Sequence, residues 1–355
     1  MKFAHFSQLF NKPDLTGHAR YEQMWRELEL ADRVGFNYGF QSVHHFFKLR
    51  PTPAVFCTGG AARTRNLRLG PMGYIAGLHD PIEIIEETAV LDNVTNGRLE
   101  IGLVFGVYPD YFRVYNADGD NRRELAKETV LALKAFYRRK QDELFNFTGP
   151  FHQYENVEFA IAPVQKPGPP IWLSSTQLET LRFLAREGVH GGYLHLHDRS
   201  EMAPRIRQFL QWWDESEHQE KPNIGYLCFV YVDETDEIAL QKAIPWIAQS
   251  SELIYGQSPR MGGTYSEVEE KLGPRSEEIL RNKLNAEFLL EQNLVFVGSP
   301  ETVARRIRSA AEEGLFNTVL AEFNIGAIGD EDLMRSIRLF GERVIPALQS
   351  FDPTQ

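Results

Sequence analysis

Cysteine is scarce in this chain of 355 residues. The only two, Cys57 and Cys228, lie far apart and form no C-x-x-C pair. This spacing argues against a disulfide framework and against a cysteine zinc site. The start of the chain lacks a long apolar signal-peptide core, and no stretch approaches 18 consecutive apolar residues. We therefore expect a protein of the reducing cytoplasm that does not cross a membrane.

Excess basic charge is also lacking, because 38 Lys and Arg residues stand against 49 Asp and Glu residues and give a net charge of −11. Binding to nucleic acid relies on clustered Lys and Arg that release counterions, so no nucleic-acid partner is expected. No glycine-rich nicotinamide fingerprint follows a strand-like run. The sequence therefore gives no sign of a nicotinamide dinucleotide site.

Strand-like apolar runs alternate with helical segments along the chain. Eight such runs are Lys2–Leu9, Tyr38–Val43, Leu67–Ile75, Arg98–Leu103, Pro170–Leu173, Gly192–Leu196, Gly225–Val232 and Asn317–Phe323. Strands separated by helices pair in parallel, and eight parallel strands close a barrel. The predicted fold is α/β, a (β/α)8 TIM barrel that occupies residues 1–355 as a single domain.

The spacing of the runs is uneven, which predicts insertions at about residues 104–169 and 233–316. The second insertion holds a glycine-rich stretch that forms neither helix nor strand readily. Two interpretations stay open for residues of about 255–275: a surface excursion, or a mobile lid over the site. Near the end of this insertion, Ser299 and Pro300 predict the start of a helix that runs to Gly314.

Two histidine pairs are candidates for chemistry. His44 and His45 end a strand-like run, and because neighbours on a strand point in different directions, one ring is expected to face the barrel axis. His195 and His197 form an H-x-H pair with Asp198 beside it, a pattern that binds zinc at some barrel rims. Substrate contact or simple packing is the favoured reading of the second pair, so no metal is expected.

Four stretches carry a resemblance to a known family. They are His44-His45, Leu67–Gly70, the run Leu91–Gly106 (LDNVTNGRLEIGLVFG) and Pro170–Ser175. In this order and spacing the chain resembles the bacterial luciferase-like flavin-dependent monooxygenases, from Phe3 to about Pro346. The TIM barrel is what this resemblance implies as well.

The resemblance assigns roles near a flavin ring. His44 would act in proton transfer beside the ring, while His45 packs toward a helix or a neighbouring subunit. A non-prolyl cis peptide, common beneath the ring in this family, is expected between Met72 and Gly73. The flavin phosphate would be bound by Arg123 and by a turn and helix start, with the residues Ser174, Ser175, Thr176, Gln177 and Thr180.

The substrate pocket is expected to be lined by aromatic residues and one imidazole: Phe6, Phe105, Tyr108, Trp172 and His195. Two positions depart from the family. Val43 stands where an acidic residue often precedes the histidine pair, and Phe105 stands where bacterial luciferase has arginine. Loss of that arginine contact predicts flavin binding weaker by about 1.5–3 kcal/mol.

The resemblance implies a reaction of reduced FMN, supplied by a separate flavin reductase, with O2. A C4a-peroxyflavin would then oxygenate a small organic substrate. Three alternatives remain open: hydride transfer with the deazaflavin F420, a non-catalytic partner subunit, and a metal-dependent hydrolase. The family dimerises through helices near Asp80–Leu91, so a homodimer is expected, with a heterodimer as the alternative.

Overall fold

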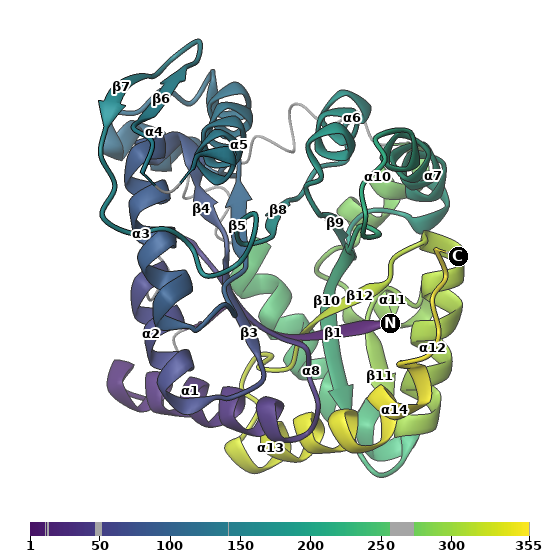
Figure 1. Cartoon of the computed structure of the whole chain (residues 1–355). Helices are drawn as coiled ribbons and strands as arrows, with labels where there is room; N and C mark the ends of the chain where they lie inside the picture. The colour runs from purple at the N-terminus through teal and green to yellow at the C-terminus, as the bar shows by residue number, and fades with distance from the viewer. Residues whose placement is uncertain (11, 13, 47–51, 141, 256–272, 355) are drawn as a thin grey trace.

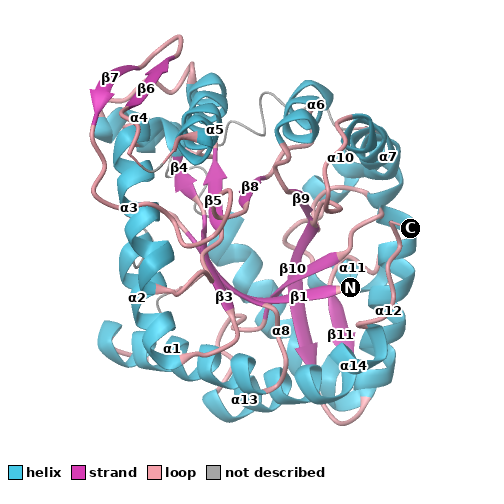
Figure 2. Ribbon diagram, viewed as in Figure 1, coloured by secondary structure: helices cyan, strands magenta, loops and turns pink. Residues whose placement is uncertain are grey.

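Parallel strands close into a barrel in the computed structural model of the chain (Figures 1 and 2). The structure describes residues 1–10, 12, 14–46, 52–140, 142–255 and 273–354. Eight strands within these residues form the barrel: β1 (Lys2–Ser7), β2 (Tyr38–Ser42), β3 (Arg68–Met72), β5 (Ile101–Val104), β8 (Ile171–Leu173), β9 (Gly191–Leu194), β10 (Ile224–Val232) and β12 (Thr318–Glu322). The predicted TIM-barrel fold is confirmed.

The barrel is closed by parallel pairing in chain order. β1 pairs with both β2 and β12, β2 pairs with β3, and β10 pairs with both β9 and β12. β5 pairs with β8 and with the two-residue strand β4 (Tyr74–Ile75), which continues the third strand. Bridges from Leu69 to Leu99 and from Trp172 to His190 complete the ring.

Helices surround the strands. They are α1 (Gly17–Arg33), α2 (Pro53–Arg63), α3 (Pro81–Val94), α4 (Pro109–Tyr115), α5 (Arg122–Arg138), α6 (Leu178–Glu187), α7 (Arg199–Glu215), α8 (Asp236–Tyr255), α10 (Pro274–Arg281), α11 (Ala286–Glu291), α12 (Pro300–Gly314), α13 (Asp330–Leu339) and α14 (Ile345–Leu348), with a 3-10 turn η1 (Ala76–Leu78) and a π-helical turn η3 (Phe340–Val344). Within the described ranges, no helix combines the length and the apolar character that crossing a bilayer requires.

Local sequence explains where several helices begin. Asp80 caps α3, since its carboxylate accepts from the Ile82 N–H, and Ser299 caps α12, which has Pro300 in its first turn. The predicted start of α12 is confirmed. At its end Leu315, with a φ of 55°, takes the left-handed position that follows a helix.

Three strands were missed by the sequence analysis. β6 (Phe145–Thr148) and β7 (Gln153–Val157) form an antiparallel hairpin inside the first insertion, and β11 (Phe296–Gly298) runs parallel to the end of β10. β11 has only three residues, too few for a periodic pattern. The proposed lid at about 255–275 falls almost wholly on residues 256–272, which lie outside the described residues.

The lower part of the barrel is filled by side chains. Ala4, Phe6, Tyr38, Phe40, Trp172 and Leu320 form a buried cluster inside the ring of strands. The Trp172 indole meets the rings of Tyr38 and Phe40 edge-on, with centroids 5.9 and 5.6 Å away. The barrel is therefore no pore, and space for a ligand opens only above this cluster.

A buried ionic network ties α1 to the barrel. The Glu27 carboxylate lies 3.0 Å from His5 Nε2 on β1 and 3.1 Å from Arg20 Nη1, and it accepts from Asn324 Nδ2 at 2.6 Å. Burial by itself would raise the pKa of Glu27, but Arg20, His5 and Asn324 outweigh burial and lower this pKa to about 2. The ionised carboxylate therefore stabilises the fold above its unfolded pKa of 4.5.

We predict that Glu27→Gln destabilises the protein at neutral pH by roughly 3–5 kcal/mol, because Arg20 loses its buried partner. In the wild type, the stability that Glu27 contributes is lost as the pH falls from about 4.5 toward 2, and the variant should lack this part of the acid sensitivity. Urea unfolding at about pH 7 and pH 3.5 measures both effects. Glu29→Gln on the same helix, at a half-exposed carboxylate 3.8 Å from Arg63, should change little; equal stability of the two variants would contradict the account.

Candidate active site

A cavity of about 370 Å³ opens at the carboxyl ends of the barrel strands. Every barrel strand contributes to its wall: Phe6, Ser42, Met72, Leu103, Leu173, Leu194, Leu227 and Leu320 come from β1, β2, β3, β5, β8, β9, β10 and β12 in turn. This volume lies within the range of roughly 300–1,000 Å³ of pockets that enclose small organic ligands. Barrel enzymes hold their active sites at this end.

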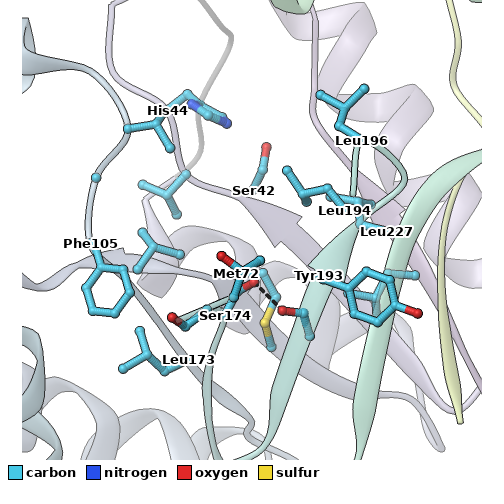
Figure 3. Close-up of a pocket in the computed structure, with 18 of the residues that line it drawn as sticks. Ser42, His44, Met72, Phe105, Leu173, Ser174, Tyr193, Leu194, Leu196 and Leu227 are labelled. Atoms are coloured by element: carbon cyan, nitrogen blue, oxygen red, sulfur yellow. Dashed lines mark hydrogen bonds between the residues drawn. The ribbon is translucent and has the colours of Figure 1, made fainter. Parts of the chain in front are cut away.

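Most of the cavity wall is apolar. Figure 3 draws Leu194, Leu196 and Leu227 on one side and Phe105 on the opposite side, with Met72 and Ser174 between them. Leu194 and Leu227 are register partners on the neighbouring strands β9 and β10. Such a wall favours a ligand with a large uncharged part.

The two neighbouring histidines separate as predicted. His44 lines the cavity, and its Nδ1 lies 3.0 Å from the Tyr111 hydroxyl in a hydrogen bond. His45 is buried outside the cavity, where its Nδ1 lies 2.9 Å from the Tyr115 hydroxyl of α4. Of these two histidines, only His44 is therefore placed to meet a molecule in the cavity.

The peptide bond between Met72 and Gly73 is cis, as the sequence analysis predicted. Met72 lines the cavity, whereas Gly73 lies behind it, against β5. A Cβ atom on Gly73 would stand 2.3 Å from the carbonyl carbon and oxygen of Gly102, and one on Gly102 would stand 2.2 Å from the Pro71 oxygen. Glycine is required on both sides of this contact.

The polar turn between β8 and α6 supplies hydroxyls and amides. Ser174, Ser175 and Thr176 line the cavity, while Gln177 caps the helix and Thr180 is buried within its first turn. Of the five predicted residues, the structure thus brings three to the cavity and leaves two behind it. Within the described chain the buried Thr176 Oγ1 has no hydrogen-bond partner, so it is suited to accept one from a ligand or to donate one to it.

Arg123 reaches the same cavity from the first turn of α5, next to Arg122. One turn further on, Lys127 donates to Glu179 of α6 at 3.1 Å, which holds the starts of α5 and α6 together. The Arg123 guanidinium lies over the Phe105 ring, 4.7 Å from its centroid. Phe105 therefore supports a neighbouring arginine at the cavity, a contact worth about 0.5–1 kcal/mol.

The predicted pocket residues all line the cavity, namely Phe6, Phe105, Tyr108, Trp172 and His195. Trp172 is fixed from below, because its Nε1 donates to Glu100 at 2.6 Å. Tyr108 donates to the Ile254 carbonyl at 3.3 Å and so connects the β5 loop to the end of α8.

His195 and His197 are not on a strand, since β9 ends at Leu194 and both follow in a turn. The predicted strand-like run Gly192–Leu196 included His195, and that placement was wrong. His195 Nδ1 donates to the Leu227 carbonyl at 3.2 Å, and burial lowers the pKa of His195 to about 4. Asp198 caps α7 through the Ser200 and Glu201 amides. Among the described residues, no group of three or more acidic, histidine or cysteine side chains is arranged to hold a metal.

Comparison with known proteins decides the family. The sequence model of the luciferase-like monooxygenase family matches residues 1–317. The chain belongs to the luciferase-like monooxygenase family. It is accordingly an oxidoreductase of the monooxygenase class.

Three known proteins show what this chain is similar to. The oxygenase component of a flavin-dependent trigonelline monooxygenase from Acinetobacter baylyi is 28% identical over 246 residues, which cover 67% of each chain. The oxygenating constituent of 3,6-diketocamphane monooxygenase from Pseudomonas putida, solved with FMN, shares 17% identity and a TM-score of 0.79 over 98% of both chains. An F420-dependent secondary alcohol dehydrogenase gives 16% identity and a TM-score of 0.72, again over 98% of both chains. The two structures support the barrel fold.

Several lining residues of this luciferase-like protein were not predicted. Glu322, at the end of β12, accepts from the Gln8 N–H at 2.8 Å and from the Asn324 N–H at 3.2 Å, and both Glu322 and Gln8 face the cavity. Arg122, Tyr111 and Lys283 also line it. A polar residue at the last position of a barrel strand, or directly after it, is the pattern that would have pointed to Glu322 and Gln8.

We predict that Gly102→Ala lowers the melting temperature sharply and reduces soluble expression, because the added methyl group meets the Pro71 carbonyl and Met72 Sδ within 2.8 Å. Gly191→Ala is the matched control. It is also a cavity-lining barrel position, but there the nearest atom to a new Cβ is Leu184 Cδ1 at 4.0 Å. Thermal unfolding of both variants tests the claim, and a Gly102→Ala protein as stable as the control would refute it.

Proposed function

We propose that this protein is the oxygenase component of a two-component monooxygenase. It takes reduced FMN from a separate flavin reductase and uses O2 to place one oxygen atom on a small organic substrate. The observation that carries the proposal is one cavity in which Met72, the Ser174–Thr176 turn, Arg123 and His44 all meet.

The donor set fits the phosphate of FMN. The hydroxyls of Ser175 and Thr176, the amides at the start of α6 and the guanidinium of Arg123 are of the kinds that bind phosphate in proteins. The Ser174 hydroxyl donates instead to the Gly192 carbonyl at 2.6 Å. The buried Thr176 Oγ1 would gain the partner that it lacks within the described chain. Phe105 holds Arg123 at this end, so the aromatic residue serves flavin binding indirectly where luciferase has an arginine.

The strand-end region around Met72 fits the flat ring. Gly73 and Gly102 bring two backbones together without side chains between them, and Met72 and Leu103 present an even apolar surface to the cavity. A planar tricyclic ring needs such a surface on one face. The leucine side of the cavity is then left for the substrate, which favours a neutral, largely apolar molecule.

When bound, reduced FMN supplies the electrons and the carbon atom at which O2 reacts. The chain contributes the remaining tasks. Its apolar wall excludes water, the Ser174–Thr176 turn and Arg123 orient the cofactor, and His44 holds or moves a proton at the cavity wall.

We further propose a cytoplasmic homodimer that forms through α2 and α3. Val55 on α2 and Val90 and Val94 on α3 are each more than 40% exposed, and the two helices pack against each other on the barrel. A heterodimer with a related chain would bury the same face. Size-exclusion chromatography with light scattering distinguishes the dimer from a monomer.

Hydride transfer with F420 is the second candidate, because an F420-dependent dehydrogenase has the same fold over 98% of this chain. F420 carries a phosphate and a planar ring, so the donor set alone does not separate the two cofactors. Comparing the apparent affinities of the protein for reduced FMN and for reduced F420 distinguishes the two cofactors.

The test of the proposed reaction is turnover in a coupled system. The purified chain is mixed with a flavin reductase, NADH, FMN and a panel of apolar ketones, aldehydes and aromatic substrates under 18O2. We expect one 18O atom per product molecule, dependent on both proteins. Oxidation of an alcohol by F420 without 18O in the product would instead establish the second candidate.

We predict that Arg123→Ala weakens FMN binding by about 10- to 100-fold, the loss of one charge-assisted contact of about 1.5–3 kcal/mol. Riboflavin, which lacks the phosphate, should bind the variant and the wild type alike. Fluorescence titration with both flavins measures the difference. Arg113→Ala, which removes a largely exposed arginine paired with Asp110, is the control; equal loss of FMN and riboflavin affinity in Arg123→Ala would exclude Arg123 as the phosphate ligand.

A further inference from the structure

Two tyrosines of α4 meet two consecutive histidines. Tyr111 and Tyr115 are four residues apart on the helix, and their hydroxyls lie 3.0 and 2.9 Å from Nδ1 of His44 and His45. The Tyr111 side chain is fully buried, so its position is fixed by packing. His44 is thereby held at the cavity wall through the nitrogen that faces α4.

The chemistry of the two groups decides which one donates. A phenol, with an ordinary pKa of about 10, is a much stronger hydrogen-bond donor than the N–H of a neutral imidazole. The bare imidazole nitrogen, whose conjugate acid has a pKa of about 6.5, is in turn a better acceptor than a phenol oxygen. The stronger arrangement is therefore Tyr111 O–H donating to His44 Nδ1.

We propose that Tyr111 is a positioning residue that fixes the neutral His44 ring with its proton on Nε2, so that His44 presents a hydrogen-bond donor to the cavity. A neutral imidazole carries a single N–H, so a ring that accepts at Nδ1 must donate at Nε2. Figure 3 shows this ring at the cavity, on the side of Ser42.

A carboxylate partner would do the opposite. It would accept from Nδ1–H and leave Nε2 as a bare lone pair, ready to act as a base. In this chain Val43 precedes the histidine pair and an uncharged hydroxyl lies beside Nδ1. The resting His44 is consequently a donor, and it selects for a molecule with an acceptor oxygen, such as a carbonyl, at this wall.

This consequence rests on the proposed function, but the tautomer itself does not. It is read in the flavin-free protein by long-range 1H–15N NMR of the histidine-labelled full chain, at a pH of about 8.5 where neutral rings predominate. Loss of one ring's signals in His44→Asn assigns them. We expect His44 to carry its proton on Nε2, and a proton on Nδ1 in the wild type would overturn the proposal without any further variant.

Two matched variants test whether the Tyr111 hydroxyl sets the tautomer of His44. Tyr111→Phe removes the hydroxyl beside His44, and Tyr115→Phe removes the equivalent hydroxyl beside His45. We expect Tyr111→Phe to lower the His44 ratio of Nε2–H to Nδ1–H at least threefold, while Tyr115→Phe leaves that ratio unchanged and lowers the melting temperature by a similar amount. An unchanged ratio in Tyr111→Phe would overturn the role of Tyr111.

Titration with oxidised FMN then identifies the acceptor. The His44 Nε2–H signal should shift as a flavin oxygen accepts this proton, and a His44 ring without a proton on Nε2 at saturating FMN would contradict a donor at this wall. Failure of the proposed function gives a different result: FMN does not bind the protein, while His44 still carries its proton on Nε2.

Discussion

The close approach of the third and fourth barrel strands is the constraint on which the cavity depends. Gly70 lies so near Glu100 that a Cβ atom would meet its carbonyl oxygen at 2.6 Å, and the contact between Gly73 and Gly102 is tighter still. These glycines let β3 and β5 run side by side from the filled base of the barrel to its open end. The surface that carries Met72 exists only because no side chain separates the two backbones.

The base of the barrel is equally specified by polar chemistry. Burial raises the pKa of the Glu100 carboxyl, although Arg68 and the Trp172 indole oppose this by hydrogen bonding to it. Trp172 is thereby fixed as the floor beneath the cavity. In the outer layer, Glu27 fixes α1 against the barrel, since it contacts His5 of β1 and Arg20 of α1. Both carboxylates serve the frame rather than the reaction.

Polar and apolar groups are divided within the cavity in a way that suits a two-part ligand. Arg123 and the Ser174–Thr176 turn form a polar end, which we propose binds the flavin phosphate, while leucines of β9 and β10 form an apolar side. His44 is held at the cavity wall by Tyr111 of α4, a helix that the first insertion supplies. An insertion in the sequence is thus part of the site.

Features that depend on neighbouring residues in the chain were predicted from the sequence. Strand periodicity located the eight barrel strands, and the pair Ser299-Pro300 located a helix start. His44 and His45 separate as expected, although β2 ends at Ser42 and both residues lie beyond it. The cis bond after Met72 was expected from family resemblance alone.

Contacts between distant residues escaped prediction. Phe105 was read as a lost arginine contact, yet its ring lies under Arg123, eighteen positions away in the chain. Tyr111 lies beside His44 although 67 residues separate them. Gln177 and Thr180 were expected at the flavin phosphate, but they are not among the residues that line the cavity. Packing of helices and loops, which no short pattern encodes, decided each of these cases.

A crystal structure of the protein with FMN tests the central claim most directly. The account predicts the flavin ring against Met72 and Leu103, with the phosphate between Arg123 and the Ser174–Thr176 turn and His44 beside the ring. A flavin bound in another orientation, with its phosphate away from Arg123, or a cavity that stays empty at saturating FMN, would contradict it.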